Sequence, residues 1–209
     1  FILEKGYGCK TRTIPGSTIP IQNGLVRGDI DILMEVWREN VSEAWAKALK
    51  SGKVKELGLN FSDAVQGWFL PPYMIQGDPA RNIKAIAPEL RSVSDLPRYK
   101  HLFRDPEQPD KGRFYNCILG WNCEVINTKK LAAYKLKNDF TNFRPGAAEA
   151  LSAAITSAYK RGKPILAYYW GPTSLLGQLD MTQIEEPPFT KECWDALVNE
   201  KEPQAACAY

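Results

Sequence analysis

The stretch FYNCILGWNCEVINTKKLAAYKL, residues 114–136, changes from one structural pattern to another around a single glycine. Its first part, residues 114–119, is apolar and aromatic and predicts a β-strand. Its second part, from about Cys123 to Leu136, predicts a helix. Gly120 and Trp121 lie between the two patterns. A strand that leads directly into a helix is typical of α/β proteins, so this stretch predicts that fold class.

The same alternation of apolar runs and amphipathic stretches continues in both directions along the chain. Strands are expected over residues 8–14, 30–36, 64–70 and 164–170, and helices over residues 18–26, 42–50, 92–103 and 147–159. From Met181 onward the sequence predicts mainly loop, because turn residues such as Pro187 and Pro188 accumulate there. Residues 1–6 read as the last turn of a helix, so the chain is expected to be part of a longer protein.

The composition limits the class of partner. The chain has 209 residues, of which 44% are hydrophobic and 24% are charged, and this suits one or two globular domains. The net charge is +3, with both signs interspersed and no block of lysines or arginines, so no nucleic acid is expected as a partner. No apolar run approaches the roughly 18 residues of a membrane-spanning helix.

The chain contains five cysteines, and two chemical roles compete for them. A zinc site is disfavoured because no CxxC pair is present and His101 is the only histidine. Disulfides in an oxidising compartment fit better, since the cysteines form two sequence-local pairs with one left over. The pairs are Cys117 with Cys123 and Cys193 with Cys207, and Cys9 is either free or paired outside this chain.

Three of the six tryptophans share one position, at the point where a predicted strand ends and the chain turns toward a helix. They are Trp37, Trp121 and Trp170. Ligands of open α/β sheets gather outside the carboxyl ends of the strands, so these three are candidate binding residues. The alternative is that they only pack in the core. Trp45 and Trp194 lack this position and are assigned to packing, and Trp68 is ambiguous.

Indole faces that converge would bind a cation without hydrogen-bond donors, and a quaternary ammonium is the obvious case. A helix that begins near Cys123 would also present the peptide N–H groups of Asn122, Cys123 and Glu124 to an anion. An aromatic face beside such amides suits a zwitterion such as a betaine. The alternative is that a Cys117–Cys123 bridge only stabilises the turn.

At this point the chain resembles the substrate-binding proteins of glycine betaine/choline/proline-betaine ABC transporters. The resemblance rests on five segments in the order of the family, namely LEKGYGCKT, GLVRGDIDILMEVW, AVQGWFLPPY, GWNCEVINTKKLAAYKL and YKRGKPILAYYWGP. It implies a two-lobe α/β fold of the type II periplasmic binding proteins, here with one complete and one partial lobe. The lobes are expected to be 1–66 with 184–209, and 67–183.

The resemblance also implies the roles of particular residues. Trp37, Trp121 and Trp170 match the tryptophan box that holds the quaternary ammonium, and Asn122 and Cys123 match the amides that hold the carboxylate. Some relatives bridge the cysteines that match Cys117 and Cys123. Some also place a histidine, which assists the carboxylate, where this chain has Val41, and this departure bears on the identity of the ligand more than on its class.

The implied function is to bind a quaternary-ammonium solute, such as glycine betaine, and to deliver it to an ABC permease. A solute-sensing receptor domain of the same fold, or a choline or carnitine binder, is the alternative. An enzyme is not expected, because no nucleophile, base or metal constellation is evident, and no cofactor or metal is expected. The protein is expected to be a monomer in the periplasm or outside the cell, or at the membrane through its transporter.

Overall fold

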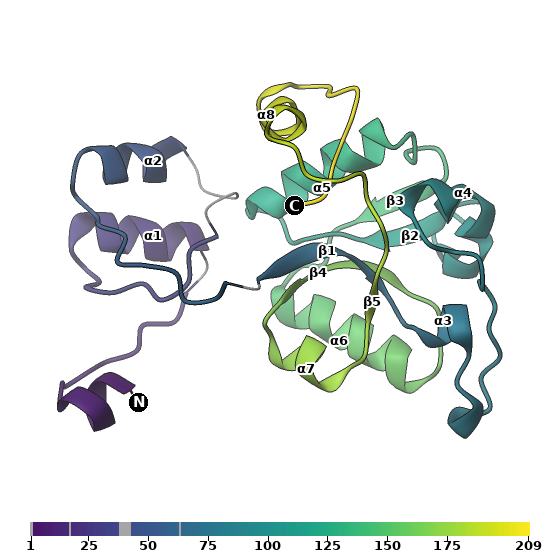
Figure 1. The fold of residues 1–209 in the computed structure, drawn as a ribbon, viewed down its shortest axis with the longest axis horizontal. Helices are drawn as coiled ribbons and strands as arrows, with labels where there is room; N and C mark the ends of the chain where they lie inside the picture. Colours follow the sequence, from purple (N-terminus) through teal and green to yellow (C-terminus); the bar gives the residue numbers. More distant parts are fainter. Residues whose placement is uncertain (1, 17, 38–42, 63) are drawn as a thin grey trace. The chain divides into compact units, whose positions relative to one another are not determined.

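The computed structural model describes residues 2–16, 18–37, 43–62 and 64–209, which form two compact units, Phe1–Asn60 and Phe61–Tyr209 (Figure 1). The first unit begins with the π-helical turn η1 (Ile2–Gly6) and contains the helices α1 (Thr18–Arg27) and α2 (Glu43–Lys50). Both helices confirm the sequence prediction. Trp45 and Ala48 lie three residues apart on one face of α2 and are buried, which confirms Trp45 as a packing residue.

The strands expected over residues 8–14 and 30–36 are not formed. The side chains of Ile32 and Met34 are 50% and 61% exposed, although their apolar run predicts burial. A strand is stable only when its N–H and C=O groups pair with a neighbouring strand. The described residues of the first unit contain no strand that could supply such a partner.

The second unit contains a mixed sheet, for which the described residues supply five strands in the order β3-β2-β4-β1-β5. β2, β3 and β4 run parallel to one another, whereas β1 is antiparallel to both β4 and β5. The strands are β1 (Val65–Leu70), β2 (Gly112–Tyr115), β3 (Phe140–Phe143), β4 (Leu166–Gly171) and β5 (Thr182–Gln183).

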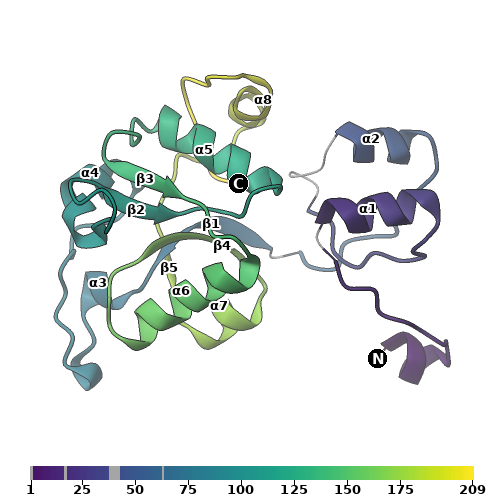
Figure 2. The same cartoon turned by 180° about the vertical axis from the view of Figure 1, so that it is seen from behind.

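Helices cover both faces of this sheet, as Figures 1 and 2 show from opposite sides. On one face lie α5 (Asn122–Ala133) and α8 (Lys191–Asn199), and on the other α6 (Ala148–Lys160) and α7 (Ser174–Gln178). The connection from β1 to β2 carries short helical segments, which are α3 (Tyr73–Gln76), η3 (Pro79–Arg81), η4 (Val93–Asp95), α4 (Leu96–Tyr99) and η5 (Lys100–Phe103).

Most of the chain after Met181 is loop, as the sequence predicts, but this stretch also contains helix α8, which the sequence analysis did not predict. Its start is capped, because the Thr190 hydroxyl accepts a hydrogen bond from the N–H of Cys193. Trp194 and Leu197 of α8 then pack with Ile126 of α5 in a small apolar cluster, which confirms Trp194 as a packing residue. Residues 184–209 thus pack within the second unit, and the lobe boundaries given above stay a prediction.

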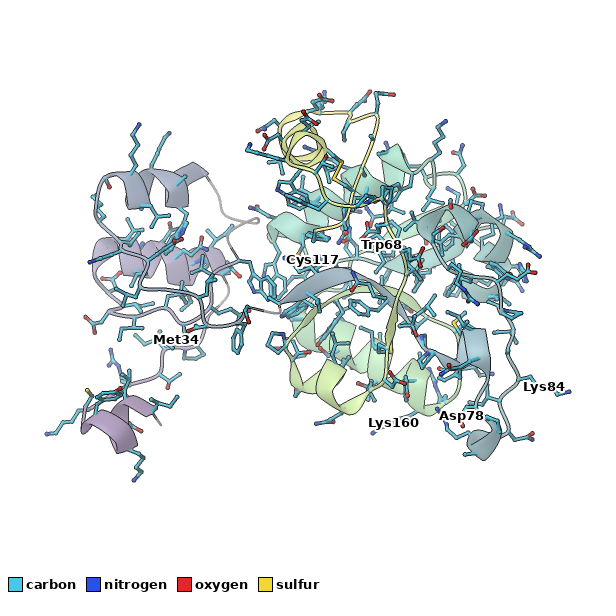
Figure 3. All side chains as sticks on the ribbon, viewed as in Figure 1. Met34, Trp68, Asp78, Lys84, Cys117 and Lys160 are labelled. Carbon is cyan, nitrogen blue, oxygen red and sulfur yellow. A yellow bond between two sulfur atoms is a disulfide. The ribbon has the colours of Figure 1, made fainter. Side chains whose placement is uncertain are left out.

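Alternating side chains of the two central strands divide the core into two layers. Trp68, Leu70 and Tyr168 belong to the cluster on the α5 side, whereas Phe69 and Tyr169 pack with α6. The side chains fill the space on both sides of the sheet in Figure 3, in which Trp68 is labelled. The Trp68 ring centroid lies 4.3 Å from that of Phe114, so Trp68 is a core residue.

A buried ion pair joins α5 to the chain that follows β5. Lys130 Nζ lies 2.8 Å from Glu186 Oε1, and the two side chains are 0% and 1% exposed. The hydroxyl of Tyr134 donates to the same oxygen at 2.9 Å. Burial lowers the pKa of the Lys130 ammonium, and the Glu186 carboxylate opposes this effect. Each charge is therefore stabilised in the interior mainly by the other.

Replacing Lys130 with Met is expected to lower the free energy of unfolding by about 3–5 kcal/mol, because it leaves the Glu186 carboxylate buried without its counter-ion. Urea denaturation followed by circular dichroism measures the change. The matched control is Lys191→Met, since Lys191 is 83% exposed in its pair with Asp195. That variant is expected to change stability by less than about 1 kcal/mol. Equal effects of the two substitutions would contradict the prediction.

Candidate functional site

Two of the predicted tryptophans meet at the carboxyl ends of the inner strands β2 and β4. β2 and β4 are parallel, so their carboxyl ends point the same way; Trp170 is the next-to-last residue of β4, and Trp121 lies in the turn that follows β2. The ring centroids of Trp121 and Trp170 are 5.3 Å apart, and the ring planes are inclined at 74°. Both side chains are half-buried. The two indoles therefore form the walls of an aromatic corner at the carboxyl ends of the strands.

The turn that carries Trp121 is closed by a disulfide. The Cα atoms of Cys117 and Cys123 are 5.9 Å apart, within the range that a bridge requires. Both cysteines are buried. Gly120 has a φ of 90°, which favours glycine because a side chain would be strained there. The chain then enters α5 with Trp121 as the N-cap residue, and the predicted Cys117–Cys123 bridge is confirmed.

The side chain of Asn116 holds the same turn through hydrogen bonds. Its Oδ1 accepts hydrogen bonds from the N–H of Cys117 at 2.6 Å and from Asn127 Nδ2 at 2.9 Å. Its Nδ2 donates to the carbonyl of Glu124 and to Asn142 Oδ1. Asn116 is fully buried; its backbone N–H still donates to the carbonyl of Phe143 in β3 at 2.8 Å, whereas the N–H of Cys117 bonds to Asn116 Oδ1 and not to a neighbouring strand. Strand β2 therefore ends at Tyr115, although the apolar run predicts a strand as far as Leu119.

The first turn of α5 holds the residues that were predicted to bind an anion. Asn122, Cys123 and Glu124 are its first three residues, and a first turn has N–H groups without partners inside the helix. The N–H of Glu124, however, donates to the carbonyl of Trp121 at 3.1 Å. The expectation that the Glu124 amide contributes to an anion site is therefore wrong. The roles of Asn122 and Cys123 stay a prediction.

Further aromatic rings support Trp170 from its own strand. The Trp170 ring stacks on that of Tyr169, with centroids 4.6 Å apart, and on that of Tyr168 at 6.2 Å. The hydroxyl of Tyr168 donates to Gln66 Oε1 at 2.7 Å, and burial raises the pKa of Tyr168. The sequence reasoning missed Gln66 and Tyr168. The alternation of AYYW could have indicated Tyr168, because residues 168 and 170 share one face of β4.

The Trp121 side chain carries one buried hydrogen-bond donor, its indole N–H. Its Nε1 is buried, and within residues 64–209 it has no hydrogen-bond partner. A buried indole N–H usually finds an acceptor, so this donor is an exception among the buried polar atoms of the unit. The aromatic corner therefore presents indole faces, while the Nε1 of Trp121 is shielded from solvent.

Trp37 lies in the first unit and is half-buried. Its Nε1 donates to Glu35 Oε1 at 2.7 Å, and Glu35 itself is exposed. That Trp37 completes a box with Trp121 and Trp170 stays a prediction. Val41, where some relatives have a histidine, lies outside the described residues.

The described residues contain a charged groove away from the two tryptophans, but no cluster of metal ligands. Among the described ranges, no three or more His, Cys, Asp or Glu side chains are grouped so as to hold a metal ion. Within those ranges, no helix combines the length and the apolar character needed to cross a membrane. A groove of about 430 Å³ lies against the edge strand β3 and is lined by charged residues such as Lys111 and Arg144. Neither Trp121 nor Trp170 lines this groove.

Residues 1–204 match the family model of the substrate-binding domain of the ABC-type glycine betaine transport system, OpuAC. The chain is 25% identical over 168 residues to the trimethylamine N-oxide-binding protein of Pelagibacter ubique, covering 79% of this chain and 51% of the relative. It is 30% identical over 150 residues to the glycine betaine/proline betaine-binding periplasmic protein of Escherichia coli, covering 71% and 42%. The chain thus spans about half the length of these relatives or less.

Solved structures share the fold. The binding protein ProX of a glycine betaine/L-proline ABC transporter from Borrelia burgdorferi superposes with a TM-score of 0.63 at 19% identity, covering 94% of this chain and 63% of that one. Lactococcal OpuAC in a closed complex with glycine betaine gives a TM-score of 0.62 at 17% identity, with coverages of 91% and 63%. The predicted α/β fold of the type II binding proteins is confirmed.

The cysteine chemistry gives a direct test. The second predicted bridge, Cys193–Cys207, has a Cα separation of 6.3 Å, whereas Cys9 is exposed and unpaired within the described residues. Without reduction, iodoacetamide is therefore expected to label Cys9 and no member of either bridge. Mass spectrometry of proteolytic peptides reads the result. Labelling of Cys123 before reduction, in protein exported to an oxidising compartment, would contradict the assignment.

Proposed function

We propose that this chain, which belongs to the family of substrate-binding domains of ABC-type glycine betaine transport systems, binds a quaternary-ammonium solute of the betaine type and delivers it to an ABC permease. The observation that carries the proposal is the corner formed by Trp121 and Trp170 beside the first turn of α5. Aromatic faces suit the cationic end of a betaine, and the start of a helix suits its carboxylate.

The aromatic corner supplies part of the binding free energy. A desolvated cation–π face is worth about 2 kcal/mol, so two faces give about 4 kcal/mol. Micromolar affinity requires about 8 kcal/mol. Trp37 is proposed as the third face, on the other lobe, and it would be brought to the ligand by hinge closure of the lobes. The remaining free energy must come from the anionic end of the ligand.

The carboxylate is proposed to lie at the amino end of α5. The amides of Asn122 and Cys123 are its proposed donors, and the helix dipole favours an anion there. The disulfide and the Asn116 hydrogen bonds hold this turn before the ligand arrives, so little conformational freedom is lost on binding.

The protein is proposed to act by binding alone, without catalysis, as a monomer in the periplasm or outside the cell. Its proposed partner is the permease of its transporter. The same binding chemistry would serve a solute-sensing receptor domain, and a choline or carnitine binder is the other alternative. A trimethylamine N-oxide ligand is a further candidate, because one relative at 25% identity is named for it.

Replacing Trp121 or Trp170 with Ala is expected to weaken glycine betaine binding by about 1–2 kcal/mol or more, that is, by about five- to thirtyfold. Each substitution removes one desolvated face, as isothermal titration calorimetry on the full-length protein would measure. The matched control is Phe189→Ala, because Phe189 is an aromatic residue of the same unit that is 47% exposed. A folded Trp121→Ala variant with unchanged affinity would refute the aromatic corner as the cation site.

Glycine betaine is expected to bind about ten- to hundredfold more tightly than choline. Choline carries the same trimethylammonium group but leaves the amide donors without an anionic acceptor, which costs about 1–3 kcal/mol. Competition titrations with glycine betaine, choline, carnitine and trimethylamine N-oxide test the proposal and rank the alternatives. Equal or tighter binding of choline would mean that the first turn of α5 is not the anion site.

A further inference from the structure

The proposed carboxylate site has an acidic residue in its immediate surroundings. Glu124 is the third residue of α5, directly after Asn122 and Cys123, and its side chain is only 10% exposed. Three residues of a helix span about one turn, so the backbone of Glu124 lies within one turn of the proposed anion donors, and its Oε1 accepts from Thr128 one turn further along α5. An unneutralised Glu124 would repel a ligand carboxylate there, and its burial would limit screening by water.

Other helices of the unit also carry an acidic residue in the first turn, but in a different environment. Glu149 of α6 and Glu192 of α8 are exposed to water. In those positions an acidic residue interacts favourably with the helix dipole, and its charge costs little desolvation because it stays in contact with water. Glu124 is buried and therefore depends on the protein for compensation.

Arg144 supplies this compensation. Its Nε forms an ion pair with Glu124 Oε1, and the hydroxyl of Thr128 donates to the same oxygen at 2.9 Å. Two further contacts orient the guanidinium, one from Nη2 to Thr128 Oγ1 at 3.3 Å and one from Nη1 to the carbonyl of Asn142 at 3.4 Å. Arg144 directly follows β3, so the edge strand of the sheet positions a charge against the start of α5.

We infer that Arg144 is a positioning residue that sets the preference for zwitterionic over purely cationic ligands, by neutralising Glu124 beside the anion site. This inference rests on the proposed function. With Arg144 in place, the first turn of α5 presents its amides to a carboxylate without a competing negative charge. Without it, the Glu124 carboxylate would oppose a betaine, whereas choline, which has no carboxylate, would meet no such repulsion.

The experiment compares full-length wild type with Arg144→Gln in calorimetric titrations of glycine betaine and of choline. The variant is expected to bind glycine betaine about three- to tenfold more weakly, as for one uncompensated charge that is partly screened. Its choline affinity is expected to stay the same or to rise. The ratio of the two affinities is the decisive readout, because damage to the fold would weaken the binding of both ligands together.

Three control variants separate charge from structure. Arg144→Lys keeps the positive charge and is expected to retain most of the wild-type ratio. Adding Glu124→Gln to Arg144→Gln removes the carboxylate that needs compensation, and it is expected to restore the ratio. Arg98→Gln removes an exposed arginine that pairs with Glu89 elsewhere in the unit, and it is expected to leave the ratio unchanged.

Two results would overturn the inference while the proposed function stands. One is a wild-type ratio in Arg144→Gln, and the other is an equal loss of affinity for both ligands in that variant. A wild-type protein that binds neither ligand would instead overturn the proposed function, and the role of Arg144 with it. The wild-type titration therefore distinguishes the two failures.

Discussion

The start of helix α5 is the constraint on which the site depends. A chain that leaves a parallel strand must turn sharply before a helix can begin, and here three devices fix that turn. Gly120 adopts the positive φ, the Cys117–Cys123 bridge closes the loop, and the buried side chain of Asn116 binds the backbone on both sides of it. The first turn of α5 and the ring of Trp121 are thereby held in one place relative to the sheet.

This constraint brings together groups that prefer ligands of opposite charge. Because β2 and β4 are parallel, the turn after β2 and the end of β4 meet at one edge, and Trp121 contacts Trp170 there. Indole faces attract cations, whereas the start of a helix attracts anions. A site that joins the two suits a small zwitterion better than either kind of ion alone. The rigid turn adds to affinity because the site is formed before the ligand arrives.

The sequence predicted those features that depend on neighbouring residues. Periodicity located β1, β4, α5 and α6, and cysteine spacing located both bridges. Features that depend on distant partners were missed or wrong. Residues 30–36 have a strand-like pattern but lack a neighbouring strand among the described residues. Lys130 and Glu186 are 56 residues apart in the sequence, and Arg144 and Glu124 are 20 residues apart, so no local sequence pattern predicts either pair.

Those long-range pairs explain how one helix can serve both stability and recognition. Toward its carboxyl end, α5 places Lys130 in a dry ion pair with Glu186, where a missing partner would leave a charge buried. At its amino end, Glu124 faces Arg144, which is 35% exposed and borders the groove beside β3. The first pair is shielded from solvent and fixes the helix in the fold. The second is open to solvent on one side, so its charge balance can be altered with less effect on the core and is suited to set ligand preference.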